Sequence, residues 1–211
     1  ERYGLTGKIC HLSTAEGLKK IMDAKTRGVP VTVEITPQHL FFDEGMITEE
    51  NRRLRELNPP FRAAEDRAAL TEALRRGEID CLASDHAPHT PEEKIKGVSG
   101  IPFLDTYGPF TAWLIKEHGF SPQDIARVCA YNPGRFVNAF RKKGDPGKGF
   151  GKIEEGYVGS LTILDITTPV KVGKAMLRTK CGWSPCEGMT FPGSVRYAVV
   201  RGAVYQKGNM L

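Results

Sequence analysis

The sequence predicts an α/β fold, in which the strands of a parallel sheet alternate with helices, followed by a β-rich segment. Short apolar runs are each followed by a stretch whose apolar residues have helical spacing, and this order occurs twice in series. Near the end of the chain, β-branched and aromatic residues occur without helical period. Strand–helix–strand crossovers place successive strands parallel, so the carboxyl ends of the strands should share one side of the sheet.

The first unit begins with an expected strand at residues 8–12, a short apolar run that carries His11. Thr14 can cap the helix that follows, because its hydroxyl can accept a hydrogen bond from an unpaired amide of the first turn. Gly28 is placed to end this helix. The β-branched run at 31–36 is the next expected strand, which completes one strand–helix–strand unit.

The second unit starts with a rigid loop at residues 58–62, Asn-Pro-Pro-Phe-Arg. A helix is expected over 65–76 and is stopped at Gly77. The apolar run 79–82 then forms a buried strand that leads to Asp85.

The loop after this strand, residues 83–90, carries Asp85 and two imidazoles. Because the strands are parallel, Asp85 and His11 are expected on the same rim of the sheet. A metal ligand and a substrate-binding group are presented in this way at the mouth of an α/β barrel. On spacing alone, the interpretation that Asp85 simply turns the chain is equally good, since Asp and His are common in turns.

Helix starts are expected further along the chain. Ser121 followed by Pro122 matches an N-cap with proline at the first helical position, and Asn132 followed by Pro133 repeats the device. The Gly- and Lys-rich stretch 141–152 indicates a linker or surface loop.

The end of the chain predicts a β-module. Residues 160–166 and 194–205 have strand composition, and Gly202 with Ala203 suits a hairpin turn.

Composition limits the functional class. No run of about 18 apolar residues is present and the first residues do not resemble a signal peptide, so membrane insertion and secretion are disfavoured. The five cysteines are scattered and odd in number, which argues against a disulfide framework and favours a reducing cytoplasm. The net charge of +5 is dispersed over helix faces without interleaved aromatics, so nucleic-acid binding is not expected. A modest positive excess also suits a doubly anionic small substrate.

Four motifs in order resemble the cyclic amidohydrolases, and specifically the dihydroorotases. They are HLST at 11–14, VEITPQHL at 33–40, NPPFR at 58–62 and ASDHAPHT at 83–90. In that family the sixth barrel strand ends in a zinc-binding His, the seventh leads into TPxHL, and the eighth ends in the DHAPH loop. Further similar segments are GIPFLDT at 100–106, YNPGR at 131–135 and GYVGSLTILD at 156–165.

The resemblance implies the C-terminal portion of such a protein. Residues 1–145 would form strands 6–8 and helices of a (β/α)8 TIM-like amidohydrolase barrel, and 146–211 the C-terminal part of a small β-sandwich domain. A complete barrel needs roughly 250 residues. None of the five His here forms the family's His-x-His motif. The family's bridging Lys or Asp and its further His come from earlier barrel strands and have no counterpart here either. These ligands are therefore expected in an N-terminal half of the same protein.

The resemblance also implies roles for four residues. His11 would ligate one metal of a two-zinc centre, and Asp85 would ligate the other and act as general base and acid toward a zinc-bound hydroxide. His89 would bind the substrate carboxylate, and Asn58 would hydrogen-bond the substrate. The plainer alternatives are a hydrogen-bonded strand-end imidazole at position 11 and an Asn kept for the backbone of a turn at position 58. His86 and His39, the other two imidazoles, are interpreted as supporting or packing residues.

The implied function is that of a dihydroorotase, which interconverts N-carbamoyl-L-aspartate and L-dihydroorotate in pyrimidine synthesis. The alternatives are an allantoinase or hydantoinase, and a non-catalytic dihydroorotase-like scaffold subunit. The expected partners are the small-molecule substrate and the N-terminal half, with a homodimer or a complex with aspartate transcarbamoylase as further assemblies. The segment alone should be inactive, because two ligands cannot hold a two-zinc centre.

Overall fold

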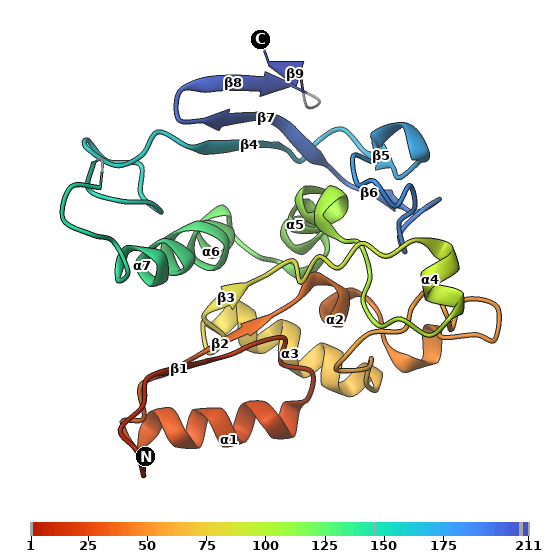
Figure 1. Ribbon diagram of the computed structural model, residues 1–211, viewed down its shortest axis with the longest axis horizontal. Helices are drawn as coiled ribbons and strands as arrows, with labels where there is room; N and C mark the ends of the chain where they lie inside the picture. Colours follow the sequence, from red (N-terminus) through yellow and green to blue (C-terminus); the bar gives the residue numbers. More distant parts are fainter. Residues whose placement is uncertain (1, 146, 207–208, 211) are drawn as a thin grey trace. The chain divides into compact units, whose positions relative to one another are not determined.

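The computed structural model describes residues 2–145, 147–206 and 209–210 (Figure 1). The chain forms two compact units. The first consists of Glu1–Asp105 with Leu177–Pro185, and the second of Thr106–Met176 with Cys186–Leu211. The chain therefore returns to the first unit late in the sequence. The expected domain boundary at 145/146 is a different division and stays a prediction.

A three-stranded parallel sheet lies in the first unit. Its strands are β1 (Gly7–Ile9), β2 (Val31–Ile35) and β3 (Cys81–Leu82), in the order β1-β2-β3 (Figure 1). Ile9 pairs with Cα partner Val33 in the parallel β1–β2 ladder, and β2 pairs with β3 in the same sense. The predicted α/β alternation with parallel strands is confirmed.

Two longer helices follow the first two strand segments and begin and end where the sequence predicts. Helix α1 (Ala15–Thr26) is capped by Thr14, whose hydroxyl oxygen accepts a hydrogen bond from the Gly17 amide at 3.0 Å. Helix α3 (Ala64–Arg76) ends at Gly77, which has the left-handed φ of 81° that glycine adopts without steric cost.

Shorter helices connect the rest of the first unit. Helix α2 (Pro37–Phe41) is capped by the Thr36 side chain, a 3-10 turn covers Glu44–Met46, and helix α4 (Pro91–Ile95) starts with a capping box at Thr90. Both α helices carry proline in the first turn, where its missing amide hydrogen is not needed.

The core of the first unit surrounds β2. Val33 and Ile35 are completely buried, as are Leu70 and Leu74 on α3. In contrast, all three residues of β1 are exposed, and among the described strands β1 pairs only with β2. The other edge strand, β3, also pairs only with β2 among these strands, but its Leu82 is buried, so the two edges differ in burial. Parallel sheets are usually covered on both faces.

The helices of the second unit include α5 (Leu104–His118), which begins just before the division of the chain, and α6 (Pro122–Ala126). The Ser121 side chain accepts from the Asp124 amide, and the Asp124 carboxylate accepts from the Ser121 amide. The helix start predicted at Ser121 is confirmed.

The second predicted helix start, at Asn132 and Pro133, is confirmed in position, because a helix begins at Asn132 with proline in its first turn, but Asn132 does not cap it. The chain runs from α6 through a π turn (Arg127–Tyr131) into α7 (Asn132–Asn138), and Tyr131 already has helical dihedral angles of −64° and −53°. The first amide of α7 donates to the first carbonyl of the π turn. Pro133 has no amide hydrogen to donate. The wider π turn before it changes the hydrogen-bond pattern, so the helix can continue through this proline.

The second unit also contains two small antiparallel sheets. A four-stranded sheet has the order β4-β7-β8-β9, and a pair joins β5 to β6 (Figure 1). The strands are β4 (Leu161–Asp165), β5 (Val170–Lys171), β6 (Thr190–Phe191), β7 (Ser194–Val200), β8 (Ala203–Gln206) and β9 (Asn209–Met210), with a 3-10 turn at Lys174–Met176. The predicted β-rich ending is confirmed, and its arrangement as a sandwich stays a prediction.

The hairpin between β7 and β8 lies one residue earlier than predicted. Arg201 and Gly202 form the turn with φ of 50° and 91°, and Ala203 already belongs to β8. Two-residue hairpin turns that match strand twist need positive φ at both positions, so the residue before the glycine joins the turn.

None of the helices in the described residues has the length and apolar character needed to cross a membrane.

Candidate active site

His11 and Asp85 lie just beyond the carboxyl ends of β1 and β3, where the sequence predicts them. His11 is half-buried and Asp85 is exposed. Both have left-handed backbone, with φ of 40° and 42°, and in the described residues the only other non-glycine residue with positive φ is Arg201 in the hairpin turn. Such backbone costs about 1–3 kcal/mol per residue and is concentrated at functional sites.

Backbone hydrogen bonds extend the sheet past the strands and fix where these two residues leave it. The Leu12 amide donates to the Glu34 carbonyl at 3.0 Å, and the Ala83 amide donates to the Ile35 carbonyl at 2.9 Å. The side-chain amide of Gln38 donates to the Ser84 carbonyl at 3.1 Å, which ties the Asp85 loop to α2. Both predicted ligands are therefore anchored through β2.

The side chains of His11 and Asp85 are available for a ligand. Within the residues that the structure describes, neither the imidazole nor the carboxylate has a hydrogen-bond partner. This separates His11 from His39 and His86, whose ring nitrogens are engaged.

His39 is a buried packing residue of α2. Its Nε2 lies 2.9 Å from the Pro59 carbonyl and its Nδ1 lies 2.6 Å from the Thr36 hydroxyl. Because a carbonyl only accepts, Nε2 carries the hydrogen and Nδ1 accepts from the hydroxyl. Burial lowers the pKa of His39, which favours this neutral form. His39 thus joins α2 to the Asn-Pro-Pro loop.

The electrostatic surroundings of His39 show which charged groups gather at this rim. The Asp85 carboxylate raises its pKa, while His11 and Arg62 lower it, all less strongly than burial does. Three groups from separate loops therefore act on one imidazole. Arg62, whose Nε lies 3.4 Å from the Ser13 hydroxyl, had no role assigned from the sequence although it stands in a recognised motif.

His86 supports the start of α5. Its Nδ1 accepts hydrogen bonds from the Phe103 and Leu104 amides, each at 3.2 Å. Nδ1 is therefore unprotonated, and this imidazole orients backbone rather than binding a metal through that nitrogen.

His89 and Asn58 lie on the two loops that border this rim. The His89 ring is about one-third exposed, and its Nδ1 lies 3.5 Å from the Glu93 carboxylate. The His89 carbonyl accepts from the Trp183 indole at 2.8 Å, a contact across 94 residues of sequence that no local pattern could reveal. Asn58 is exposed, directly before the proline whose carbonyl binds His39.

His11 and Asp85 fit a zinc centre in kind but not in number. Imidazole and carboxylate are ordinary zinc ligands, but zinc sites take three or four protein ligands. Residues 2–145, 147–206 and 209–210 contain no cluster of three or more His, Cys, Asp or Glu side chains able to hold a metal. A complete centre would need ligands from outside this chain.

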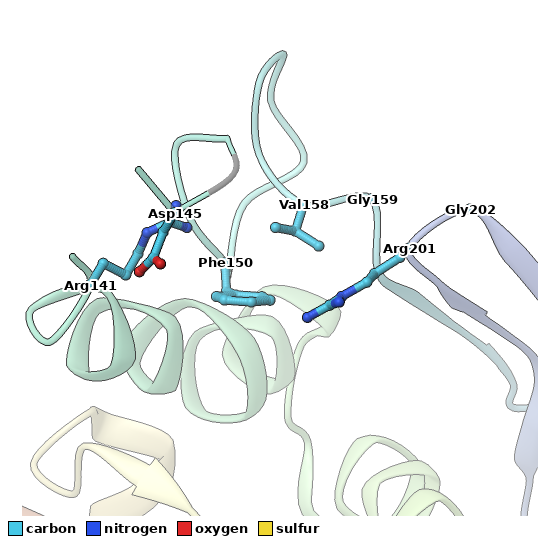
Figure 2. Close-up of a pocket in the computed structure, with 7 residues that line it drawn as sticks. All are labelled: Arg141, Asp145, Phe150, Val158, Gly159, Arg201 and Gly202. Atoms are coloured by element: carbon cyan, nitrogen blue, oxygen red, sulfur yellow. The ribbon is translucent and has the colours of Figure 1, made fainter. Parts of the chain in front are cut away.

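The second unit has a pocket of about 640 Å³ that contains none of the predicted site residues. Figure 2 shows Arg141 and Arg201 on opposite sides of Phe150 in this pocket. Its remaining lining residues are Asp145, Val158, Gly159 and Gly202. It offers cations and an apolar floor but no imidazole or thiol, so the catalytic candidates are confined to the rim of the first unit.

No protein-family model matches the chain. Individual proteins do: a dihydroorotase of Clostridium botulinum is 34% identical over 200 residues, covering 94% of this chain and 46% of that protein. A dihydroorotase of Pyrococcus furiosus is 35% identical over 196 residues, covering 93% of this chain and 44% of that protein. The chain is related to the dihydroorotases. It spans about half the length of these relatives, so the motif-based resemblance to the C-terminal portion of a dihydroorotase is confirmed.

The fold of this dihydroorotase-related chain is also that of a solved amidohydrolase. It matches an L-hydantoinase (dihydropyrimidinase) from Arthrobacter aurescens with a TM-score of 0.88 and 28% identity, covering 100% of this chain and 47% of that one. Sequence and structure thus agree on a cyclic amidohydrolase.

Proposed function

We propose that the protein to which this chain contributes is a dihydroorotase, which reversibly closes N-carbamoyl-L-aspartate to L-dihydroorotate in pyrimidine biosynthesis. The observation that carries the proposal is the pair His11 and Asp85: both have strained backbone at the carboxyl edge of one parallel sheet, and both side chains are without a partner in the described residues. The dihydroorotases at 34% and 35% identity support the choice of reaction.

His11 and Asp85 would each hold one of two zinc ions, with the remaining ligands supplied from outside this chain. Bound zinc would polarise the scissile carbonyl and lower the pKa of water. In the hydrolytic direction the Asp85 carboxylate takes a proton from the attacking water. The same carboxyl then gives that proton to the ring nitrogen as its bond to carbon breaks, and ring closure follows this path backwards.

Asn58 and His89 would bind the substrate on either side of that carboxylate. His89 would donate a hydrogen bond to the substrate carboxylate, and Asn58 would pair with a polar group of the ring. The cation of Arg62 favours an anionic ligand at this rim, because Arg62 and Asp85 both act on the imidazole of His39.

The architectural part of the proposal is that this chain supplies strands 6–8 of a (β/α)8 barrel and the C-terminal part of a β-sandwich. The fold match to an L-hydantoinase supports it, as does the exposed edge at β1, where a preceding barrel strand would pair. An N-terminal half would supply the other zinc ligands. A cytoplasmic location, a homodimer and a complex with aspartate transcarbamoylase belong to the same proposal.

A hydantoinase or allantoinase is the second candidate, and the L-hydantoinase match at 28% identity favours it specifically. The deciding experiment is turnover of dihydroorotate, hydantoin and allantoin by the full-length zinc-loaded protein. A dihydroorotase should prefer dihydroorotate by at least about 10⁴-fold in kcat/KM, because a site built for its carboxylate leaves buried polar groups unpaired with the other two.

Preference for hydantoin or allantoin would overturn the choice of substrate and keep the reaction class. No turnover of any of the three, with zinc absent, would instead support a non-catalytic scaffold subunit. The intact His11, Asp85 and His89 argue against that third alternative.

A further inference from the structure

A lysine in the first unit is completely buried, and within the described part of the chain no carboxylate forms an ion pair with it. Lys94, on the short helix α4, has no exposed surface. Its ammonium donates three hydrogen bonds, to the carbonyls of Glu56 at 2.6 Å, Val98 at 2.8 Å and Gly100 at 2.8 Å. An ammonium has three donors, so every donor is used on backbone.

Burial of this kind is costly and needs a compensating role. A lysine charge is rarely buried completely, and here burial lowers the pKa of Lys94. An apolar side chain of the same length would fill the space without that cost, but it could not bind carbonyl groups. The three bonds are therefore what a lysine contributes at this position.

The three carbonyls belong to two different loops. Glu56 lies two residues before Asn58, whereas Val98 and Gly100 follow α4. The Gly100 amide also donates to the Glu56 carbonyl at 3.0 Å. Lys94 thus fixes the distance between the Asn58 loop and the segment after α4.

That segment in turn sets the place of His89. Gly100 has a φ of +117°, and a Cβ built on it would lie 2.6 Å from the Ala87 Cβ and 3.3 Å from Cδ2 of His89. The Ala87 amide donates to the Ile101 carbonyl at 3.1 Å. The backbone at Gly100 is packed so closely against the 87–89 loop that a shift of one moves the other.

We propose that Lys94 is a positioning residue, whose ammonium holds the Asn58 loop and the His89 loop at the separation at which both side chains reach one small anionic substrate. The inference rests on the proposed function for the substrate-binding roles of Asn58 and His89. It adds to that function a residue that touches neither substrate nor metal.

The test compares Lys94→Met with Lys96→Met in the full-length protein. Methionine nearly keeps the length of the chain and loses all three hydrogen bonds. Lys96 is exposed at the end of the same helix and provides the matched control. KM for dihydroorotate should rise about tenfold or more in Lys94→Met, with zinc content unchanged, because displaced binding groups lose substrate affinity before chemistry. Lys96→Met should match the unmodified protein.

A purely structural role would give a different result, in which the active fraction and kcat fall and KM stays within about twofold of the control. That outcome would overturn the proposal. Lys94→Gln keeps two amide donors, so its KM should lie between those of the unmodified protein and Lys94→Met. If Lys94→Met does not fold, the KM of Lys94→Gln tests the proposal in its place.

Amide hydrogen exchange separates this inference from the proposed function. Exchange at Gly100 and Ala87 should accelerate at least about tenfold in Lys94→Gln and not in Lys96→Met, whatever substrate the protein uses. The unmodified protein could fail to turn over dihydroorotate while exchange still accelerates in Lys94→Gln. The proposed function would then be wrong, but the connection between the two loops through Lys94 would stand. Unchanged exchange at both amides would refute the connection itself.

Discussion

The two predicted metal ligands occupy unequal ends of one sheet. Asp85 follows β3, in a loop braced by the Gln38 side chain and by the indole of Trp183. His11 follows β1, whose residues are all exposed. Among the described strands β1 and β3 each pair only with β2, so the two ends differ in burial and bracing and not in the number of partner strands. Described residues of this chain therefore brace the Asp85 end of the sheet, whereas the strand before His11 is left exposed.

The largest effect is expected at the braced end. Asp85→Asn in the full-length protein removes the basic carboxylate at nearly constant size, so kcat should fall about 10² to 10⁴-fold, as for a lost general base. Asp23→Asn, at an exposed position of α1, should leave kcat unchanged. Steady-state turnover of dihydroorotate together with zinc analysis measures this. Near-normal turnover in Asp85→Asn would refute the assigned role.

The reactivity of two cysteines, Cys81 on β3 and Cys10 beside His11, measures how open the two ends of the sheet are. Burial raises the pKa of Cys81 on β3 to about 11, so at pH 8 only about 0.1% of this thiol is the reactive thiolate. Cys10, beside His11, is exposed, and its pKa is raised too, first by burial and then by the Glu34 carboxylate.

In single-cysteine forms of the chain, Cys81 should alkylate about 100-fold more slowly than a free thiol at pH 8. Its rate should rise about tenfold per pH unit up to about pH 10 and then level off, because the thiolate fraction saturates as pH reaches the raised pKa. Mass spectrometry of iodoacetamide time courses gives both rates. Equal labelling of Cys10 and Cys81 would mean that the two ends are equally open.

A smaller change is expected at the substrate-binding side of the braced loop. His89→Ala should keep the metal content of the unmodified full-length protein and raise KM for dihydroorotate about tenfold, with a smaller loss in kcat. Metal content and steady-state kinetics on the same preparation separate the two effects. Loss of zinc in His89→Ala would make it a ligand, contrary to its assigned role.

The smallest effect is expected at the open edge. Ile9→Ala in the isolated chain should change the unfolding free energy by less than about 0.5 kcal/mol, because 40% of Ile9 is exposed. Ile35→Ala, at a fully buried site in β2, should cost about 2–5 kcal/mol. Urea denaturation of both variants measures the difference. A larger cost for Ile9→Ala in the full-length protein than in the isolated chain would demonstrate that β1 is covered there.

Local signals predicted the parts of the fold that depend on local physics. The caps at Thr14, Gly77 and Ser121 each satisfy helix ends within a few residues, so a single sequence is enough to find them. The pattern of Asn132 and Pro133 is equally local and located the start of α7, but it did not reveal the preceding π turn, which no cap signal marks.

The sequence predicted which residues belong to the site, but it did not predict their geometry. The motifs identified His11 and Asp85, but their left-handed backbone follows from ladder bonds to β2, which sequence alone does not specify. Lys94 was missed because a lysine on a short polar helix has the sequence appearance of a solvated residue. Its burial results from carbonyls up to 38 residues away.

The open edge of β1 also determines how this chain behaves when it is produced alone. A strand with an unpaired edge, with exposed Ile9 on it and exposed Tyr3 and Leu5 before it, is a template for the same strand of a second molecule. Edge-to-edge pairing is second order in protein concentration, so dilution favours the monomer and concentration favours aggregates. Lys8 opposes such pairing only weakly, because its charge is already paired with Glu34 at 2.6 Å. Yield of the isolated chain is therefore governed by concentration and by what is co-expressed to cover β1.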